Sequence, residues 1–378
     1  MIYFDNAATT KDKPQEVKDA FFYYISEIGV SPGRGSYGLG IEASRMLYQT
    51  REKVAMYFGL QEPNVVFTKN STEAINLFFR GFLKKGDHVV ISPYEHNAVL
   101  RPLQALREKN LIEYTVVSPE DLGLSGDAFA NKYFNENTVL LAMTLASNLT
   151  GRIVFSKERC IVAKSKGVAT FVDASQGAGK IRLDMLNDGI DYVAFTGHKD
   201  LRGLPGVGGL CSKEELKIEP LIQGGTGVHG HEKTNPAIYP DAYESGTMNM
   251  PAIWAFGQAV EYSEREHDRC LSIECELVNH LIEGLKNVPY VTIYDMDCDR
   301  VSTVGFNVRG YSSNEVVRIL DKHGICVRGG MHCAILAHET LGTVNTGVVR
   351  VSFCENNTLE EIDELIAIIK TIGDKRCI

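Results

Sequence analysis

Two stretches of the sequence, VATFVDASQ at residues 168–176 and DYVAFTGHK at residues 191–199, decide the fold. Each begins with an apolar run of the length of a buried β-strand, and each ends in small and polar residues. Such runs are typical of a parallel sheet covered by helices, in which ligands lie at the carboxyl ends of the strands. We therefore expect Asp173, Gln176 and Lys199 to lie close together at one edge of a sheet.

The same pattern recurs between residues 60 and 211. The apolar runs cover residues 64–68, 88–92, 140–146, 168–172, 191–195 and 207–211. The polar residues that follow these runs include Ser71, Thr72, His96, Asn148, Asp173, Gln176, Thr196, His198 and Lys199. We predict an α/β fold with a mostly parallel central sheet covered by helices, in which these polar residues line one crevice.

The pattern changes at about residue 252, where a long helical stretch is followed by short strands and two helices. The short strands are predicted at residues 291–293, 303–308, 325–327 and 348–352. The two helices each begin with a capping box, Ser312-x-x-Glu315 and Thr358-x-x-Glu361. We predict a large domain over residues 15–251 and a small α+β domain over 252–378, with residues 1–14 packing near the active site beside the small domain.

Composition and charge exclude several classes of protein. The chain has 378 residues, with 39 Lys and Arg against 48 Asp and Glu, a net charge of −9, which argues against nucleic acid as a main partner. The longest uncharged apolar run, residues 139–146, is too short to cross a membrane, and we read no secretory signal, so we expect a cytoplasmic protein without membrane association. The nine cysteines include no C-x-x-C pair, so we predict neither a disulfide framework nor a metal site.

The polar residues at the strand ends match the needs of pyridoxal 5′-phosphate. This cofactor requires a lysine for a Schiff base, a carboxylate beside its pyridine nitrogen, a donor to its phenolate oxygen and a phosphate cradle. Lys199, Asp173 and Gln176 supply the first three, and Ser71-Thr72 at a helix start supplies the cradle. Each residue taken alone could be a helix cap or a surface side chain; their occurrence together favours the cofactor site.

Four segments resemble a known family. They are YFDNAATT at residues 3–10, STEAIN at 71–76, TGHK at 196–199 and YESGT at 243–247. In this order they resemble the class V aminotransferase superfamily, specifically the cysteine desulfurases and selenocysteine lyases, and the resemblance runs nearly from end to end of the chain. It implies the type I fold of pyridoxal-phosphate-dependent transferases, with residues 15–251 as the cofactor-binding domain.

The resemblance also implies roles for individual residues. Lys199 resembles the Schiff-base lysine and His96 the imidazole stacked on the cofactor ring. The other residues implied to bind the cofactor are Ser71, Thr72, Asn148, Asp173, Gln176, Thr196, His198 and Thr247. Thr247 resembles a threonine that reaches the phosphate of the second subunit, which implies an obligate homodimer.

A glycine-flanked segment near the end of the chain contains the cysteine with the most reactive surroundings. Residues 328–334 read RGGMHCA, with Arg328 and a histidine near Cys333, and such an electropositive loop favours a thiolate. The segment resembles that of the group II desulfurases, in which the cysteine accepts sulfur from the substrate. Arg350 resembles the arginine that binds the substrate carboxylate through two parallel N–H bonds, with Arg328 and Asn148 as further substrate contacts.

The function that the resemblance implies is conversion of L-cysteine to L-alanine, with sulfur held on Cys333 as a persulfide for an acceptor protein, as in iron–sulfur cluster assembly. A selenocysteine lyase or selenium donor is the alternative, and a class V aminotransferase is less favoured because it gives Cys333 no use. A nicotinamide-binding protein would need a G-x-G-x-x-G after the first strand, which is missing.

The sequence departs from the family pattern at two positions. Tyr37 stands where relatives often carry a histidine, and Ile335 stands near Cys333 where a proline is common. A tyrosine can form hydrogen bonds but does not act as a base near neutral pH. We therefore do not expect Tyr37 to replace that histidine as a base in substrate contact or sulfur relay.

Overall fold

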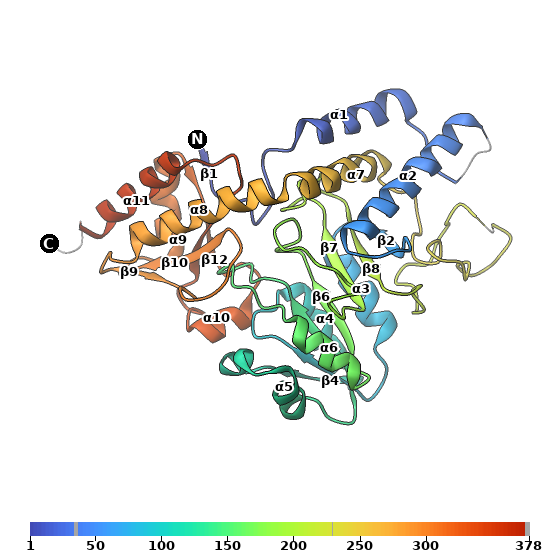
Figure 1. The fold of residues 1–378 in the computed structure, drawn as a ribbon, viewed down its shortest axis with the longest axis horizontal. Helices are drawn as coiled ribbons and strands as arrows, with labels where there is room; N and C mark the ends of the chain where they lie inside the picture. Colours follow the sequence, from blue (N-terminus) through green and yellow to red (C-terminus); the bar gives the residue numbers. More distant parts are fainter. Residues whose placement is uncertain (34–36, 229, 375–378) are drawn as a thin grey trace.

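The computed structural model describes residues 1–33, 37–228 and 230–374, and it contains a large and a smaller sheet (Figure 1). Arg34, Gly35 and Ser36, which precede Tyr37, and Cys377 lie outside the described residues. The seven strands of the large sheet are β2 (Val65–Thr68), β3 (Asp87–Ile91), β4 (Ile112–Val116), β5 (Thr138–Thr144), β6 (Ala169–Asp173), β7 (Tyr192–Thr196) and β8 (Gly208–Ser212). Their order is β2-β8-β7-β6-β5-β3-β4, and β8 runs in the opposite direction to the other six strands. The predicted α/β fold with a mostly parallel sheet is confirmed.

Alternation along the buried strands explains how both faces of this sheet are covered. In β5, Leu140 and Ala142 belong to the core on one face, and Leu141 and Met143 belong to the core on the other. The first face packs against α3 (Ser71–Phe82) and α4 (Asn97–Arg107). The core on the opposite face also contains side chains of α1 (Gln15–Tyr23), α2 (Gly38–Tyr57), α5 (Gly126–Tyr133), α6 (Lys157–Ser165) and α7 (Met250–Arg265).

The smaller part of the molecule is an antiparallel sheet with its own helices, at the left of Figure 1. Its strands, in the order β12-β13-β10-β9, are β9 (Val291–Ile293), β10 (Thr303–Val308), β12 (Arg328–Gly330) and β13 (Val348–Ser352). Its helices are α8 (His267–Leu285), α9 (Ser313–Lys322), α10 (Ile335–Leu341) and α11 (Leu359–Asp374). Both predicted capping boxes are confirmed, since Ser312 and Thr358 exchange hydrogen bonds with Glu315 and Glu361. The limits assigned to the two domains stay predictions.

The amino-terminal segment joins the smaller part to the large sheet. Strand β1 (Ile2–Tyr3) pairs in parallel with β11 (Ile325–Cys326), and Phe4 packs in the core of the smaller part. Further along, the Thr10 hydroxyl donates to the carbonyl of Lys199 at 2.8 Å. Two short irregular helices complete the described chain, η1 (Tyr24–Ile28) and η2 (Pro119–Gly123).

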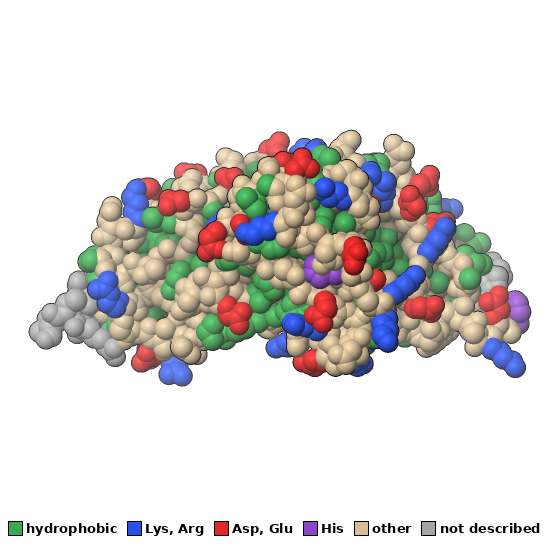
Figure 2. Space-filling view, turned by 90° about the horizontal axis from the view of Figure 1, so that it is seen from below, with side chains coloured by type: hydrophobic (Ala, Val, Ile, Leu, Met, Phe, Trp, Pro, Cys, Tyr) green, Lys and Arg blue, Asp and Glu red, His purple; other side chains and the backbone are tan. Residues whose placement is uncertain are grey.

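The surface carries both signs of charge. On the face seen in Figure 2, acidic and basic side chains of the described residues are interspersed. Within the described part of the chain, no helix combines the length and the apolar character needed to cross a bilayer.

A buried network of charges connects the two parts. Lys180 Nζ lies 2.9 Å from Asp200 and 3.1 Å from Glu274 of α8, and the three side chains are at most 4% exposed. Arg202 pairs with Glu274 at 3.2 Å and also with Glu355. Because Asp200 follows Lys199 directly, this network fixes the segment that carries the lysine.

We predict that Lys180→Met lowers the free energy of unfolding by about 3–5 kcal/mol, because it leaves Asp200 and Glu274 buried without their cation. The control is Lys53→Met, which removes a partly exposed pair with Glu261 and should cost no more than about 1 kcal/mol. The midpoints of urea unfolding of the two variants measure the difference. Equal midpoints would show that the buried network contributes no more than a surface pair.

Candidate functional site

A cavity of about 220 Å³ lies at the carboxyl ends of the strands of the large sheet. It is lined by Asn70, Ser71, Thr72, His96, Thr144, Asn148, Asp173, Ser175, Gln176, Thr196, His198 and Lys199. Nine of the residues predicted from the sequence to share one crevice are in this set. The parallel strands bring them together, because segments far apart in the sequence end at the same edge.

Lys199 follows β7 on a tight turn. Arg202 has a φ of 57° and its N–H donates to the Lys199 carbonyl at 2.8 Å, which closes the turn. Burial lowers the pKa of the Lys199 amine to about 8, although the nearby Asp173 carboxylate opposes this shift. A substantial fraction of the amine is therefore neutral near physiological pH and can act as a base or nucleophile.

Asp173 and Gln176 stand beside this lysine. Asp173 ends β6 and is 2% exposed, and its Oδ1 accepts hydrogen bonds from the Ser175 N–H at 3.0 Å and the Ser175 hydroxyl at 2.5 Å. The Gln176 side chain donates to the carbonyl of Ala7 at 2.8 Å. The carboxylate thus points into a polar, enclosed space in which it can hold a positive partner.

His96 is held at the start of α4 in a defined tautomer. Its Nδ1 accepts from the N–H of Ala98 at 3.0 Å, so the ring proton is on Nε2. Burial, followed by the charge of Lys199, lowers the pKa of His96 to about 4. The imidazole is therefore neutral at physiological pH and can lie against a flat ring.

Several buried polar atoms of the cavity have no hydrogen-bond partner among the described residues. They are Thr196 Oγ1, His198 Nδ1 and Asn148 Oδ1. Leaving such atoms unpaired costs free energy, so the site is built to bind a polar group. The first turn of α3 begins at Ser71 and presents backbone N–H groups to the same cavity, an arrangement that suits an anion. Together with Lys199 and Asp173, these features fit pyridoxal 5′-phosphate.

Asp5 links the two arginines that the sequence singles out. Its carboxylate lies 2.7 Å from Arg350 Nη2 and 2.9 Å from Arg328 Nη2. Arg350 is 3% exposed, donates through Nη1 to the carbonyl of Asn148 at 2.9 Å, and leaves Nε without a partner among the described residues. Asp5 was missed as a site residue, although it belongs to the segment 3–10 that carries the resemblance.

Cys333 lies on a loop with an unusual backbone. His332 and Cys333 have φ values of 47° and 54°, a region that side chains other than glycine rarely occupy. Asn148 donates to the His332 carbonyl at 2.7 Å, and the Asn97 N–H donates to the Cys333 carbonyl at 2.7 Å. The exposed Cys333 is thus tied to Asn148, which lines the cavity, and to Asn97, which follows His96.

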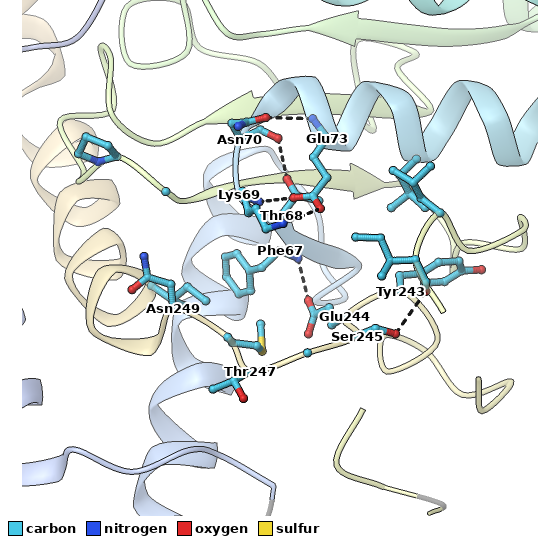
Figure 3. A pocket seen from close by; sticks show the side chains of 18 of the residues that line it. Phe67, Thr68, Lys69, Asn70, Glu73, Tyr243, Glu244, Ser245, Thr247 and Asn249 are labelled. Carbon is cyan, nitrogen blue, oxygen red and sulfur yellow. Dashed lines mark hydrogen bonds and ion pairs between the residues drawn. The ribbon is translucent and has the colours of Figure 1, made fainter. Parts of the chain in front are cut away.

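Thr247 does not line the Lys199 cavity of its own chain. It is exposed and borders a second cavity of about 510 Å³, where Figure 3 shows it across from Asn70 and Glu73. Its segment is anchored because Glu244 forms a paired contact with Arg51, 2.7 and 2.9 Å long.

The chain is similar to known proteins over nearly its whole length. A family model described as Aminotransferase class-V matches residues 2–365. A probable cysteine desulfurase of Methanothermobacter thermautotrophicus is 33% identical over 96% of this chain and 92% of its own. One of Pyrococcus abyssi is 32% identical over 98% of this chain and 94% of its own. The apo structure of a cysteine desulfurase from Thermococcus onnurineus is similar with a TM-score of 0.89 and 31% identity, over 99% of this chain and 95% of that one.

The lowered pKa of Lys199, about 8, predicts how its reactivity depends on pH. In the protein freed of small molecules, reductive labelling of Lys199 by an aldehyde should rise about tenfold per pH unit below pH 8 and level off above it, since only the neutral amine reacts. Mass spectrometry of the labelled peptide measures the rate, and Lys199→Ala identifies the peptide by its loss. A rate that still climbs tenfold per unit between pH 9 and 10 would contradict the lowered pKa.

Proposed function

Because the chain belongs to the class V aminotransferase family and its relatives are named cysteine desulfurases, we propose that it removes sulfur from L-cysteine, forms L-alanine and holds the sulfur on Cys333 as a persulfide. One observation carries the proposal. The exposed Cys333 is tied through hydrogen bonds to the residues around a cavity that contains a partly buried lysine and a buried aspartate. An aminotransferase has no need of such a cysteine.

Different residues around the cavity bind different parts of the cofactor. We propose that Ser71, Thr72, Thr196 and His198 hold its phosphate, and that His96 and Gln176 contact its ring. Asn148 has an unpaired Oδ1 and lies beside them. When bound through Lys199, pyridoxal phosphate supplies an electron sink that makes the Cα–H bond of an amino acid acidic.

The chain's own groups then carry out the proton transfers. Asp173 is buried beside the cofactor site, so its carboxylate would stabilise a proton on the pyridine nitrogen. Lys199, freed as a neutral amine, takes the proton from Cα of the substrate. His96 is held neutral and is placed to exchange a hydrogen bond or a proton with the substrate thiol.

Substrate orientation depends on Arg350. Its guanidinium is fixed by Asp5 and by the carbonyl of Asn148, which leaves Nε free to donate to the substrate carboxylate, with Arg328 nearby. The Cys333 thiolate forms a bond to the substrate sulfur as the bond between that sulfur and Cβ breaks. The electron pair of the broken bond remains with the carbon skeleton, which is protonated and released as alanine.

We also propose that the working protein is a homodimer in which Thr247 completes the phosphate site of the partner subunit. Thr247 is exposed and separate from the Lys199 cavity of its own chain. Helix α2 carries apolar side chains on the surface, with Ile41, Tyr48 and Met56 between 52% and 73% exposed. Burial of such a surface in a dimer is favourable.

The first prediction from the proposed function concerns Cys333. The wild type should release alanine and sulfide from L-cysteine in equal amounts in the presence of a reductant, and Cys333→Ala should retain roughly a tenth or less of this turnover. The variant should still cleave L-selenocysteine, because selenium leaves more easily. Lys199→Ala serves as the control that loses both reactions. Unimpaired cysteine turnover by Cys333→Ala would rule out the proposed nucleophile. A wild-type protein that cleaves L-selenocysteine but not L-cysteine would indicate a selenocysteine lyase.

The second prediction concerns Thr247. The Thr247→Ala homodimer should bind the cofactor roughly tenfold more weakly, through loss of one hydrogen bond to a charged group. In a purified heterodimer of one Thr247→Ala subunit and one Lys199→Ala subunit, both defects fall in the same site if Thr247 crosses the interface. The other site is intact, so at limiting cofactor the heterodimer should show about half of the wild-type activity. Activity no higher than that of the Thr247→Ala homodimer would show that Thr247 acts within its own chain.

A further inference from the structure

Another concave surface adjoins the Lys199 cavity, and most of its lining residues have no part in the proposed reaction on cysteine. This surface, the α3–α4 groove, encloses about 360 Å³ and is lined by Thr72, Asn76, Arg80, His96, Asn97, Ala98, Arg101, Pro102, Ala105 and Cys333. Thr72 and His96 also line the Lys199 cavity, so the two spaces are neighbours. Cys333 is therefore open to an acceptor that lies in the groove.

The groove follows two helix faces. Thr72, Asn76 and Arg80 are spaced by four residues on α3, and Arg101 and Ala105 have the same spacing on α4. At a rise of about 1.5 Å per residue, the distance from Thr72 to Arg80 is about 12 Å along the helix. An extended peptide of three or four residues has this length at about 3.3 Å per residue.

The charge of the groove is positive. Arg80 and Arg101 are exposed, none of the ten lining residues is acidic, and neither arginine has an ion pair among residues 1–33, 37–228 and 230–374. The Arg80 side chain donates through Nε to Asn76 Oδ1 at 3.4 Å. In a chain with a net charge of −9, two arginines without an ion pair, beside the exposed Cys333, form a site for anionic groups.

Helix α4 binds the backbone of the Cys333 loop and also carries Arg101. Asn97, the first residue of α4, donates its N–H to the Cys333 carbonyl at 2.7 Å, and Arg101 follows one turn later. In the orientation that satisfies both neighbours, the Asn97 amide also accepts from Arg101 at 3.3 Å and donates to the Cys333 carbonyl at 3.3 Å. Arg101 thus contacts the same residue that binds the backbone of Cys333.

We propose that the α3–α4 groove binds an acidic, cysteine-containing segment of the acceptor protein, with its carboxylates on Arg80 and Arg101 and its thiol at Cys333. This inference rests on the proposed function. The acceptor thiolate bonds to the outer sulfur of the Cys333 persulfide, the bond between the two sulfurs of the persulfide breaks, and Cys333 leaves as a thiolate. The acceptor carries the persulfide away, and the step needs no further oxidant or reductant.

The test uses the holoenzyme loaded with a persulfide by limiting L-cysteine. Three capped tripeptides are offered, in which cysteine is flanked on both sides by aspartate, asparagine or lysine. Mass spectrometry follows the loss of one sulfur atom from the protein and its gain by the peptide. We expect the aspartate peptide to react about fivefold faster than the lysine peptide at low salt, and the preference to shrink as the salt concentration rises.

Matched variants separate recognition from the intrinsic reactivity of the peptides. The double variant Arg80→Gln, Arg101→Gln should lose the preference, because it lacks both cations of the groove. Arg107→Gln, on α4 but outside the groove and paired with Glu113, should keep it. Equal peptide rates in the wild type, or a preference that survives in the double variant, would overturn the proposal. A wild-type protein on which no persulfide forms on Cys333 would overturn the proposed function itself, so the two failures are distinguishable.

Discussion

Burial of the Lys199 amine beside Asp173 is the constraint on which the rest of the site depends. A lysine removed from water loses its preference for the charged form, which makes the amine available for chemistry near pH 8. That burial needs a rigid support, because a mobile lysine would reach water. The turn closed by Arg202 and the network of Lys180, Asp200 and Glu274 give this support from behind. The buried charges therefore hold Lys199 in place and also join the smaller part of the molecule to the large sheet.

The amino-terminal segment has a comparable role on the substrate side. Asp5 joins Arg350 of β13 to Arg328 of β12, and Thr10 binds the backbone of Lys199. A short segment at the start of the chain thus bridges the smaller sheet and the end of β7. This connection explains why residues 3–10 are as informative as the lysine motif, although they contain no group that reacts.

The sequence predicts the large sheet well, because its buried strands are apolar runs that end in polar residues. Strand β4 was missed because IEYTV, at the sheet edge, is half-exposed and mixes polar with apolar residues. The short β1 and β12 pair only through tertiary contacts and were also missed. The residues that line the Lys199 cavity could be predicted because strand ends of a parallel sheet converge. The buried charge network could not be predicted, because no regular spacing relates residues 180, 200, 202, 274 and 355. The α3–α4 groove could not be predicted either, because its two helices come together only in the folded protein.

The loop of Cys333 lies between the Lys199 cavity, which the sequence predicts, and the α3–α4 groove, which it does not. Its left-handed backbone at His332 and Cys333 costs on the order of 1–3 kcal/mol per residue, so it persists only because neighbouring groups hold it. Asn148 holds it from the Lys199 cavity, Asn97 holds it from α4, and the carbonyl of Val348 binds His332 at 2.8 Å. A cysteine held in this way lies beside both the Lys199 cavity and the α3–α4 groove without the motion of a long loop. It is kept at the boundary between the Lys199 cavity and the α3–α4 groove, which is the position that the proposed transfer of sulfur from substrate to acceptor requires.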